Sequence, residues 1–154
     1  MKILIMSDSH GNNRAMIDAV TIESPELILH LGDCDSDCSG LINRFPDITL
    51  RSVRGNCDPW SNGPDVCDFR IGEKHFFMTH GHLHRVKSGI RAIVDSTFKR
   101  GADVLLFGHT HIPHCEIGDK LAVINPGSIG VGEKTYAVLN LSDGAIRCVI
   151  KNLS

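Results

Sequence analysis

Near its start the chain reads Lys2-Ile3-Leu4-Ile5-Met6-Ser7-Asp8-Ser9-His10, and this segment introduces a pattern that organises the whole sequence. Residues 2–6 form an apolar run that is too short for a helix and predicts a buried strand. Asp8 and His10, whose side chains can bind a metal, follow at once. If the chain stays extended beyond the strand, the two side chains point the same way because they are two residues apart.

The same pattern occurs four more times. The later junctions are Gly32-Asp33 after residues 27–31, Gly55-Asn56 after 48–53, His80-Gly81-His82 after 75–79, and Gly108-His109-Thr110-His111 after 104–107. Each places Asp, Asn or His directly after an apolar run that reads as a buried strand. Five such junctions predict a cluster of oxygen and imidazole ligands where the strands of one sheet end.

Periodicity and turn residues predict the other elements. Strands are expected at 26–31, 48–53, 66–71, 74–79, 103–107, 114–117, 120–124, 135–141 and 145–150, and helices at 14–22, 39–44 and 88–100. Asn12 or Asn13 is the expected N-cap of the first helix. In the third helix, Ile90, Ile93, Val94, Thr97 and Phe98 are expected to form one apolar face.

The order of these elements predicts an α/β fold. Strands alternate with helices in the first two-thirds, which favours a parallel sheet with outer helices, and the last third is antiparallel. We expect two sheets face to face with helices outside. The 154 residues fit one domain, 1–154, which is long enough to bury its own core.

Composition excludes several classes of function. The formal charge of −2 offers no general attraction for nucleic acid or an anionic membrane. No apolar run approaches the ~20 residues that span a bilayer. The first strand begins at residue 2, so a signal peptide would consume a core strand. The six cysteines form no CxxC pair and are expected as free thiols in the cytoplasm. Cys67, Cys115 and Cys148 are expected to be small packed residues.

The junction residues have the chemistry of a metal site. Mixed nitrogen and oxygen ligands suit Mn, Fe, Zn or Ni better than Ca. Asp33 can bridge two ions with its two oxygens, and Asn56 offers a carbonyl oxygen. His80, His109 and His111 offer imidazoles. Two ions ~3.5–4 Å apart would clamp a phosphate and activate water for its displacement.

Each residue alone also has an ordinary structural explanation. Asp8 could cap a helix, Asp33 and Asp58 could be turn residues, and His80 a hydrogen-bonded residue at a strand end. Together these explanations would need the same coincidence five times, so the metal site is preferred. At other positions the ordinary explanation is preferred. His30 is expected to be a core histidine, and His75 and His114 to be strand or surface residues. Arg54 is expected to be solvated or paired, with a phosphate contact as the alternative. Trp60 is an exposed contact residue or a packed one, and Asn125-Pro126-Gly127-Ser128 a structured turn at the edge of the site.

The five motifs resemble those of the calcineurin-like metallophosphoesterase superfamily, and the Gly55-Asn56-Cys57-Asp58 variant resembles its small YfcE-type phosphodiesterase branch. They occur in the family's order between residues 8 and 111. The resemblance implies a four-layer αββα fold with a dinuclear metal centre. Carried onto this chain, it assigns Asp8, His10, Asp33 and His111 to one metal, and Asp33, Asn56, His80 and His109 to the second.

The resemblance also implies a mechanism. A hydroxide held between the two metals attacks phosphorus, with Asp33, Asn56, Cys57 and Asp58 as the expected catalytic residues. Mn²⁺ is the expected ion, with Ni²⁺, Zn²⁺, Fe²⁺ or Mg²⁺ as alternatives. Most of the superfamily has histidine where this chain has Cys57. A neutral thiol lacks the positive charge with which a protonated histidine binds phosphate. We therefore expect slow hydrolysis of esters with poor leaving groups and a preference for activated or diester substrates. His82 or His84 is a candidate to replace that histidine.

The resulting hypothesis is a metal-dependent phosphodiesterase acting on a small phosphate ester. One alternative is a non-catalytic interaction scaffold on the same fold, like the retromer subunit that resembles this family. A phosphomonoesterase with the same mechanism is the other. The resemblance also suggests a homodimer or homotetramer.

Overall fold

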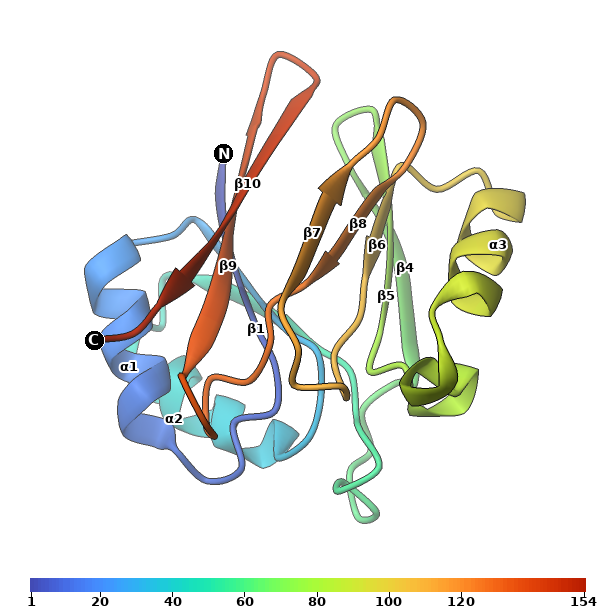
Figure 1. The fold of residues 1–154 in the computed structure, drawn as a ribbon. Helices are drawn as coiled ribbons and strands as arrows, with labels where there is room; N and C mark the ends of the chain where they lie inside the picture. Colours follow the sequence, from blue (N-terminus) through green and yellow to red (C-terminus); the bar gives the residue numbers. More distant parts are fainter.

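The computed structural model describes residues 1–154 as ten strands in two five-stranded sheets, with three α-helices and three short 3₁₀ turns (Figure 1). The first sheet has the strand order β10-β9-β1-β2-β3. Its members are β1 (Lys2–Met6), β2 (Leu27–His30), β3 (Thr49–Ser52), β9 (Thr135–Ser142) and β10 (Ala145–Asn152). The first three are parallel, and β9 and β10 complete the sheet in antiparallel pairing.

The second sheet has the order β4-β5-β6-β8-β7. Its members are β4 (Val66–Ile71), β5 (Lys74–Thr79), β6 (Val104–Leu106), β7 (His114–Ile117) and β8 (Ala122–Asn125). The hairpin β4-β5 has the predicted bounds, and β5, β6 and β8 are parallel. Both sheets are therefore mixed. The parallel strands β1 and β2 of the first sheet and β5, β6 and β8 of the second are largely buried, and burial on both faces favours the continuous apolar runs seen in the sequence.

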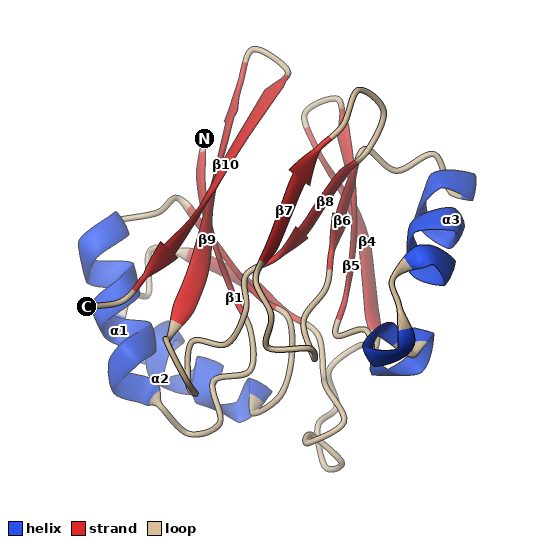
Figure 2. Ribbon diagram, viewed as in Figure 1, coloured by secondary structure: helices blue, strands red, loops and turns tan.

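The helices lie on the outer faces of the two sheets, as Figure 2 shows. α1 (Asn13–Glu23) and α2 (Cys38–Arg44) cover the first sheet, and α3 (Arg91–Lys99) covers the second. Three apolar layers result, one between the sheets and one under each set of helices. This confirms the predicted αββα arrangement. None of the helices is long and apolar enough to cross a membrane.

The N-cap of the first helix is also confirmed, since the side chain of Asn12 accepts a hydrogen bond from the amide of Ala15 at 3.1 Å. Three details of the prediction are wrong. α3 begins at Arg91, after the turn Val86–Ser88 and Gly89, whose φ of 128° does not fit a helix. Phe98 is 54% exposed and lies off the buried face of α3. Cys115 is exposed, because it lies on β7 at the edge of the second sheet.

A buried carboxylate, Glu23, fastens α1 to the first sheet. Its oxygens accept hydrogen bonds from Lys151 at 2.8 Å and Tyr136 at 2.9 Å, and Lys2 lies at 2.9 Å. Burial alone would raise the pKa of Glu23, but hydrogen bonds from Lys151, Lys2 and Tyr136 lower it to about 2. Three strands and one helix thus meet at a single charged group.

Replacing Glu23 with glutamine is therefore expected to cost about 2–3 kcal/mol of the free energy of unfolding at neutral pH. Because the pKa of Glu23 is lower in the folded state, its contribution is complete above the unfolded value of about 4.5. The contribution is lost as the pH falls towards about 2. Urea unfolding of both proteins across this range measures the difference, with Glu73→Gln, in an exposed turn, as control. A difference that stays constant with pH would contradict the prediction.

Candidate metal centre

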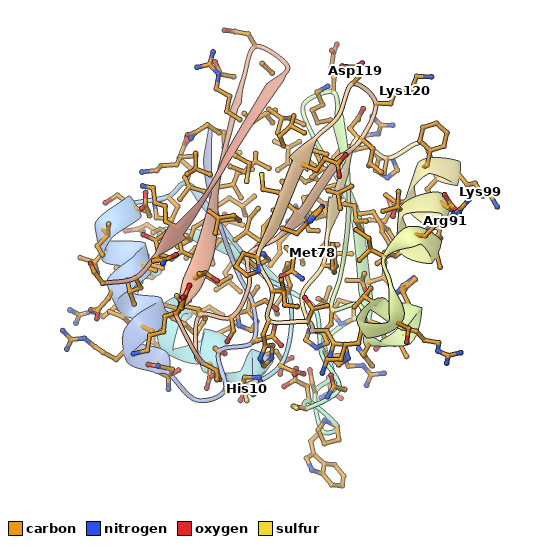
Figure 3. The ribbon with its side chains drawn as sticks, in the orientation of Figure 1. His10, Met78, Arg91, Lys99, Asp119 and Lys120 are labelled. Atoms are coloured by element: carbon orange, nitrogen blue, oxygen red, sulfur yellow. The ribbon has the colours of Figure 1, made fainter.

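The predicted residues meet where β1, β2 and β3 of one sheet and β5 and β6 of the other end. The prediction that the ligands cluster at the strand ends of a single sheet is therefore wrong, because strands of both sheets carry them. The amide of Asp8 donates to the carbonyl of Gly32, and the amide of Gly108 donates to that of His80. His80 Nδ1 lies 2.7 Å from the carbonyl oxygen of Leu31 and links the two sheets. In Figure 3 His10 lies at this lower edge, well away from the core residue Met78.

The first group of side chains contains Asp8, His10, Asp33 and His111, whose ligand atoms all lie within 4.8 Å of one another. His111 Nε2 is 3.0 Å from Asp8 Oδ1 and 3.3 Å from His10 Nε2. His10 Nε2 is 3.9 Å from Asp33 Oδ2. Two carboxylates and two imidazoles converge on one point, which is the arrangement that a divalent ion requires.

The second group contains Asp33, His80 and His109, again within 4.8 Å of one another. His80 Nε2 lies 3.3 Å from Asp33 Oδ1 and 3.2 Å from Asn56 Oδ1. The rings of His80 and His109 meet edge to face with centroids 5.0 Å apart. Asp33 is common to the two groups and presents Oδ1 to the second and Oδ2 to the first. All seven candidate ligands are thus brought together in two adjoining sets.

The environment of these groups suits cations. Asp8 is fully buried and Asp33 is 2% exposed, yet neither forms an ion pair with lysine or arginine. Buried carboxylates this close require a compensating positive charge. The Nδ1–H of His80 can donate to Leu31, which leaves Nε2 with its lone pair towards the centre. The residues therefore fit divalent metal ions.

The pKa shifts within the centre differ in sign from residue to residue. Burial would raise the pKa of Asp33, but the hydrogen bond with His80 and the amide of Cys57 lower it well below its usual range. Burial would lower the pKa of His80, but Asp33 and Asp8 raise it above its usual value. Burial and the charge of His80 lower the pKa of His109 to about 4. His109 is thus a neutral imidazole, which is the form that binds a metal.

The backbone of the centre is unusual. Asp8, His10, Asp33, His109 and His111 all have positive φ, between 45° and 68°. The expectation of an extended chain after Met6 is therefore wrong, and Asp8 and His10 converge through left-handed turns instead. Such a conformation costs a non-glycine residue ~1 kcal/mol or more. Its occurrence at five of the seven candidate ligands indicates that the surrounding structure holds these residues in a locally unfavourable conformation, as is common at functional sites.

Asp58 holds the backbone of the centre in place. Its carboxylate is 6% exposed and accepts hydrogen bonds from the amides of Gly55 at 2.7 Å, Asp33 at 2.9 Å and Asp35 at 3.0 Å. With both oxygens occupied by amides, Asp58 positions the segments that carry Asp33 and Asn56. These contacts support a positioning role.

Replacing Asp58 with alanine would leave three amides without their acceptor. We expect a loss of about 3 kcal/mol in the free energy of unfolding, because unpaired buried donors cost about 1–3 kcal/mol each and some will find water. Metal affinity should fall roughly 10–100-fold, as is usual when a residue that supports the ligands is lost. Chemical denaturation and a metal titration measure the two effects, and Asp47→Ala in an exposed turn is the control. Unchanged stability together with unchanged metal affinity would contradict this role.

Cys57 lies beside the second group. Its amide donates to Asp33 Oδ1 at 2.9 Å, and its exposed thiol is 3.5 Å from Asn56 Nδ2. Partial loss of hydration at the sulfur and the charge of Asp33 raise the pKa of the Cys57 thiol to about 11. Cys57 thus places a neutral group beside the second group of candidate ligands near pH 7.

The remaining sequence candidates separate into near and distant residues. His82 is near, with its ring centroid 5.4 Å from that of His80, whereas His84 packs edge-on against Phe77. Arg54 is paired with Asp65 through two hydrogen bonds, at 2.6 and 3.2 Å. Trp60 is 91% exposed, so it is not packed against its own domain.

The residues expected to be structural behave as such. His30 is fully buried, with Nε2 3.2 Å from Ser9 Oγ, and His75 contacts Asp68 on the neighbouring strand. The turn after β8 supports the edge of the centre, because Asn125 donates to the carbonyl of Gly108 at 3.1 Å and Ser128 donates to that of Asp8 at 2.8 Å.

Two residues outside the predicted ligand set also support the centre. The hydroxyl of Ser7 donates to Asp8 Oδ2 at 2.5 Å. Asp37 accepts from Ser9 Oγ at 2.7 Å and from the amide of Gly11 at 2.8 Å. Ser7 directly precedes a predicted ligand, and this adjacency is the one feature that could have drawn attention to it.

Comparison with known proteins agrees with this geometry. The chain is 34% identical over 152 residues to a probable metallophosphoesterase, YsnB, of Bacillus subtilis, covering 94% of this chain and 87% of that protein. It is 32% identical over 147 residues to a phosphodiesterase of Methanocaldococcus jannaschii, covering 82% and 83%. Vps29 of Entamoeba histolytica in complex with zinc has the same fold, with a TM-score of 0.75, 20% identity and 99% of both chains covered.

A family model, the calcineurin-like phosphoesterase superfamily domain, matches residues 1–144. This match spans all five strand-end motifs and both groups of candidate ligands. The bacterial relative is named a probable metallophosphoesterase and the archaeal relative a phosphodiesterase, and the matches cover 87% and 83% of them. The chain belongs to the calcineurin-like phosphoesterase superfamily.

Proposed function

We propose that this protein is a metal-dependent phosphodiesterase that uses two divalent ions, with Mn²⁺ as the leading candidate. One observation carries the proposal: Asp33 belongs to both groups of converging ligands and presents a different oxygen to each. A shared carboxylate would hold two ions side by side, which is the arrangement that two-metal hydrolysis needs.

When bound, two such ions would activate water as a nucleophile and neutralise charge on the phosphate oxygens. The chain's own residues hold and orient the ligands. Asp8 is held by the hydroxyl of Ser7 and the amide of His109, and Asp33 by the amide of Cys57. Asn56 contributes a neutral oxygen, so the second group carries less negative charge than the first. These hydrogen bonds fix the orientation of the ligands, and correct orientation of the reacting groups contributes strongly to the rate.

The preferred substrate class depends on which group can protonate the leaving group. Cys57 stands where most of the superfamily has histidine, and a thiol, unlike an imidazolium, offers no positive charge to the phosphate. His82 is the imidazole nearest to the second group outside the candidate ligands. We therefore favour diesters and esters with good leaving groups over simple alkyl monoesters.

Metal removal and return test the proposal. The purified protein treated with a chelator is expected to lose hydrolysis of bis(p-nitrophenyl) phosphate, and Mn²⁺ is expected to restore it. A panel with Ni²⁺, Zn²⁺, Fe²⁺ and Mg²⁺, on both diesters and monoesters, ranks ions and substrates and separates a diesterase from a monoesterase. Hydrolysis that persists undiminished without metal would contradict the proposal.

A non-catalytic scaffold is the second candidate, and the fold shared with Vps29 is the observation that favours it. Because that protein was solved with zinc, metal content alone does not separate the two functions. Turnover does: a metal-loaded protein that hydrolyses no ester in the panel would support the scaffold.

A further inference from the structure

A pocket of about 360 Å³ lies between the turns that precede α3 and the loop that joins β6 to β7. In Figure 1 these are the yellow-green coil below α3 and the golden loop that leads into β7. The volume is in the range of small-molecule sites, about 300–1,000 Å³. No residue of the pocket belongs to the two groups of candidate ligands.

The pocket adjoins the candidate centre on two sides. Val86, in one wall, packs directly on Gly81, where an added Cβ would lie 2.9 Å from the Val86 side chain. Gly81 follows the candidate ligand His80. Thr110, in the opposite wall, stands between His109 and His111 in the chain. Residues next to candidate ligands, in space or in the chain, thus form two walls of the pocket.

The walls are apolar with few polar groups. Val86, Ile90, Phe107 and Ile112 supply the apolar surface, and Lys87 adds a positive charge at the rim. His114 also lines the pocket, and its buried Nε2 has no hydrogen-bond partner. Glu116 Oε2 lies 3.7 Å from that nitrogen, beyond hydrogen-bonding distance. Mostly apolar walls with a few polar groups are typical of small-molecule sites.

We propose that this pocket binds an aryl substituent of the phosphate ester, an inference that rests on the proposed function of the neighbouring centre. Thr110, Lys87 and His114 could pair with only some hydroxyls of a sugar-like substituent, and burying the others against the apolar walls would be costly. An aryl group would cover Ile112, an aliphatic side chain that is 69% exposed. Lys87 would attract the anionic phosphate towards the same side of the centre.

Binding of two phosphonates to the metal-reconstituted protein tests the inference without turnover. Phenylphosphonate is expected to bind roughly tenfold more tightly than methylphosphonate in titration calorimetry, because burial of the ring contributes about that factor. The variant Ile112→Asn should lose most of this preference while its affinity for methylphosphonate stays unchanged. Ile112 is exposed, so the change is compatible with folding. The matched control is Leu83→Asn, which replaces a residue that is 60% exposed beside His82 and outside the pocket.

Equal affinity of the wild-type protein for the two phosphonates would overturn the inference. So would a preference that survives in Ile112→Asn, or one that is lost equally in Leu83→Asn. Hydrolysis of bis(p-nitrophenyl) phosphate is measured separately. Turnover without a phenyl preference refutes the pocket alone, and a phenyl preference without turnover refutes the proposed hydrolysis alone.

Discussion

Replacement of Asp33 by asparagine is expected to lower phosphodiester hydrolysis by roughly 10³-fold or more, since a lost bridging charge removes several kcal/mol of transition-state stabilisation. Asp33 contributes one oxygen to each group of ligands, at 3.3 Å from His80 and 3.9 Å from His10. Asparagine keeps the volume but presents one neutral oxygen and an amide that repels cations. Both metal sites should weaken together.

Metal content separates this effect from an ordinary loss of one ligand. The variant His109→Ala removes a side chain of the second group only, so it is expected to retain one bound ion per chain, whereas Asp33→Asn should retain close to none. Asp18→Asn, on the exposed face of α1, is the control for a lost carboxylate. An Asp33→Asn protein with two bound ions and wild-type turnover would refute the shared-ligand arrangement.

The architecture could be predicted from the sequence because its signals are local. The apolar runs of β1, β2 and β6 are too short for helices and end at polar turns, and the structure has strands there. The hairpin β4-β5 was readable from Gly72-Glu73 between two strand-like runs. Asn12 could be identified as a cap because such caps act within three residues.

Most of the errors concern interactions that join distant segments, and one is local. The strand-end pattern does not show which sheet a strand joins, so the contributions of both β3 and β5 to one centre could not be read from it. The expected helix from residue 88 follows the apolar spacing, but Gly89 adopts a φ of 128° that delays the helix to Arg91. Cys115 was expected to be packed, and its position on an edge strand exposes it.

The candidate centre shows the same division. Residue types predicted which side chains meet, because carboxylates and imidazoles at strand ends have few other uses in common. How they meet depends on left-handed backbone at Asp8, His10 and Asp33, which local preference alone disfavours. The amide-binding role of Asp58 depends on Gly55, Asp33 and Asp35 folding around it, which no spacing rule predicts.

The close approach of Gly55 to Asp33 leads to the second large effect. A Cβ on Gly55 would lie 2.6 Å from the amide nitrogen of Asp33 and 3.0 Å from its Cγ, and it would overlap Oδ1. Asp33 cannot move away easily, because its amide is bonded to Asp58 and Oδ1 to the amide of Cys57. Gly55 itself does not have positive φ, so the constraint is steric.

Gly55→Ala is therefore expected to lower the free energy of unfolding by about 3 kcal/mol, near the upper end for overpacking. It should also lower turnover roughly 100-fold, since displacement of a ligand by about 1 Å has effects of that size. Gly40→Ala is the matched control, because the added Cβ in α2 would meet only Asn13 Oδ1, at 3.9 Å. Alanine in that helix should be neutral or stabilising by up to about 1 kcal/mol. If Gly55→Ala unfolds and turns over like Gly40→Ala, the packing of Gly55 on Asp33 does not hold the centre together.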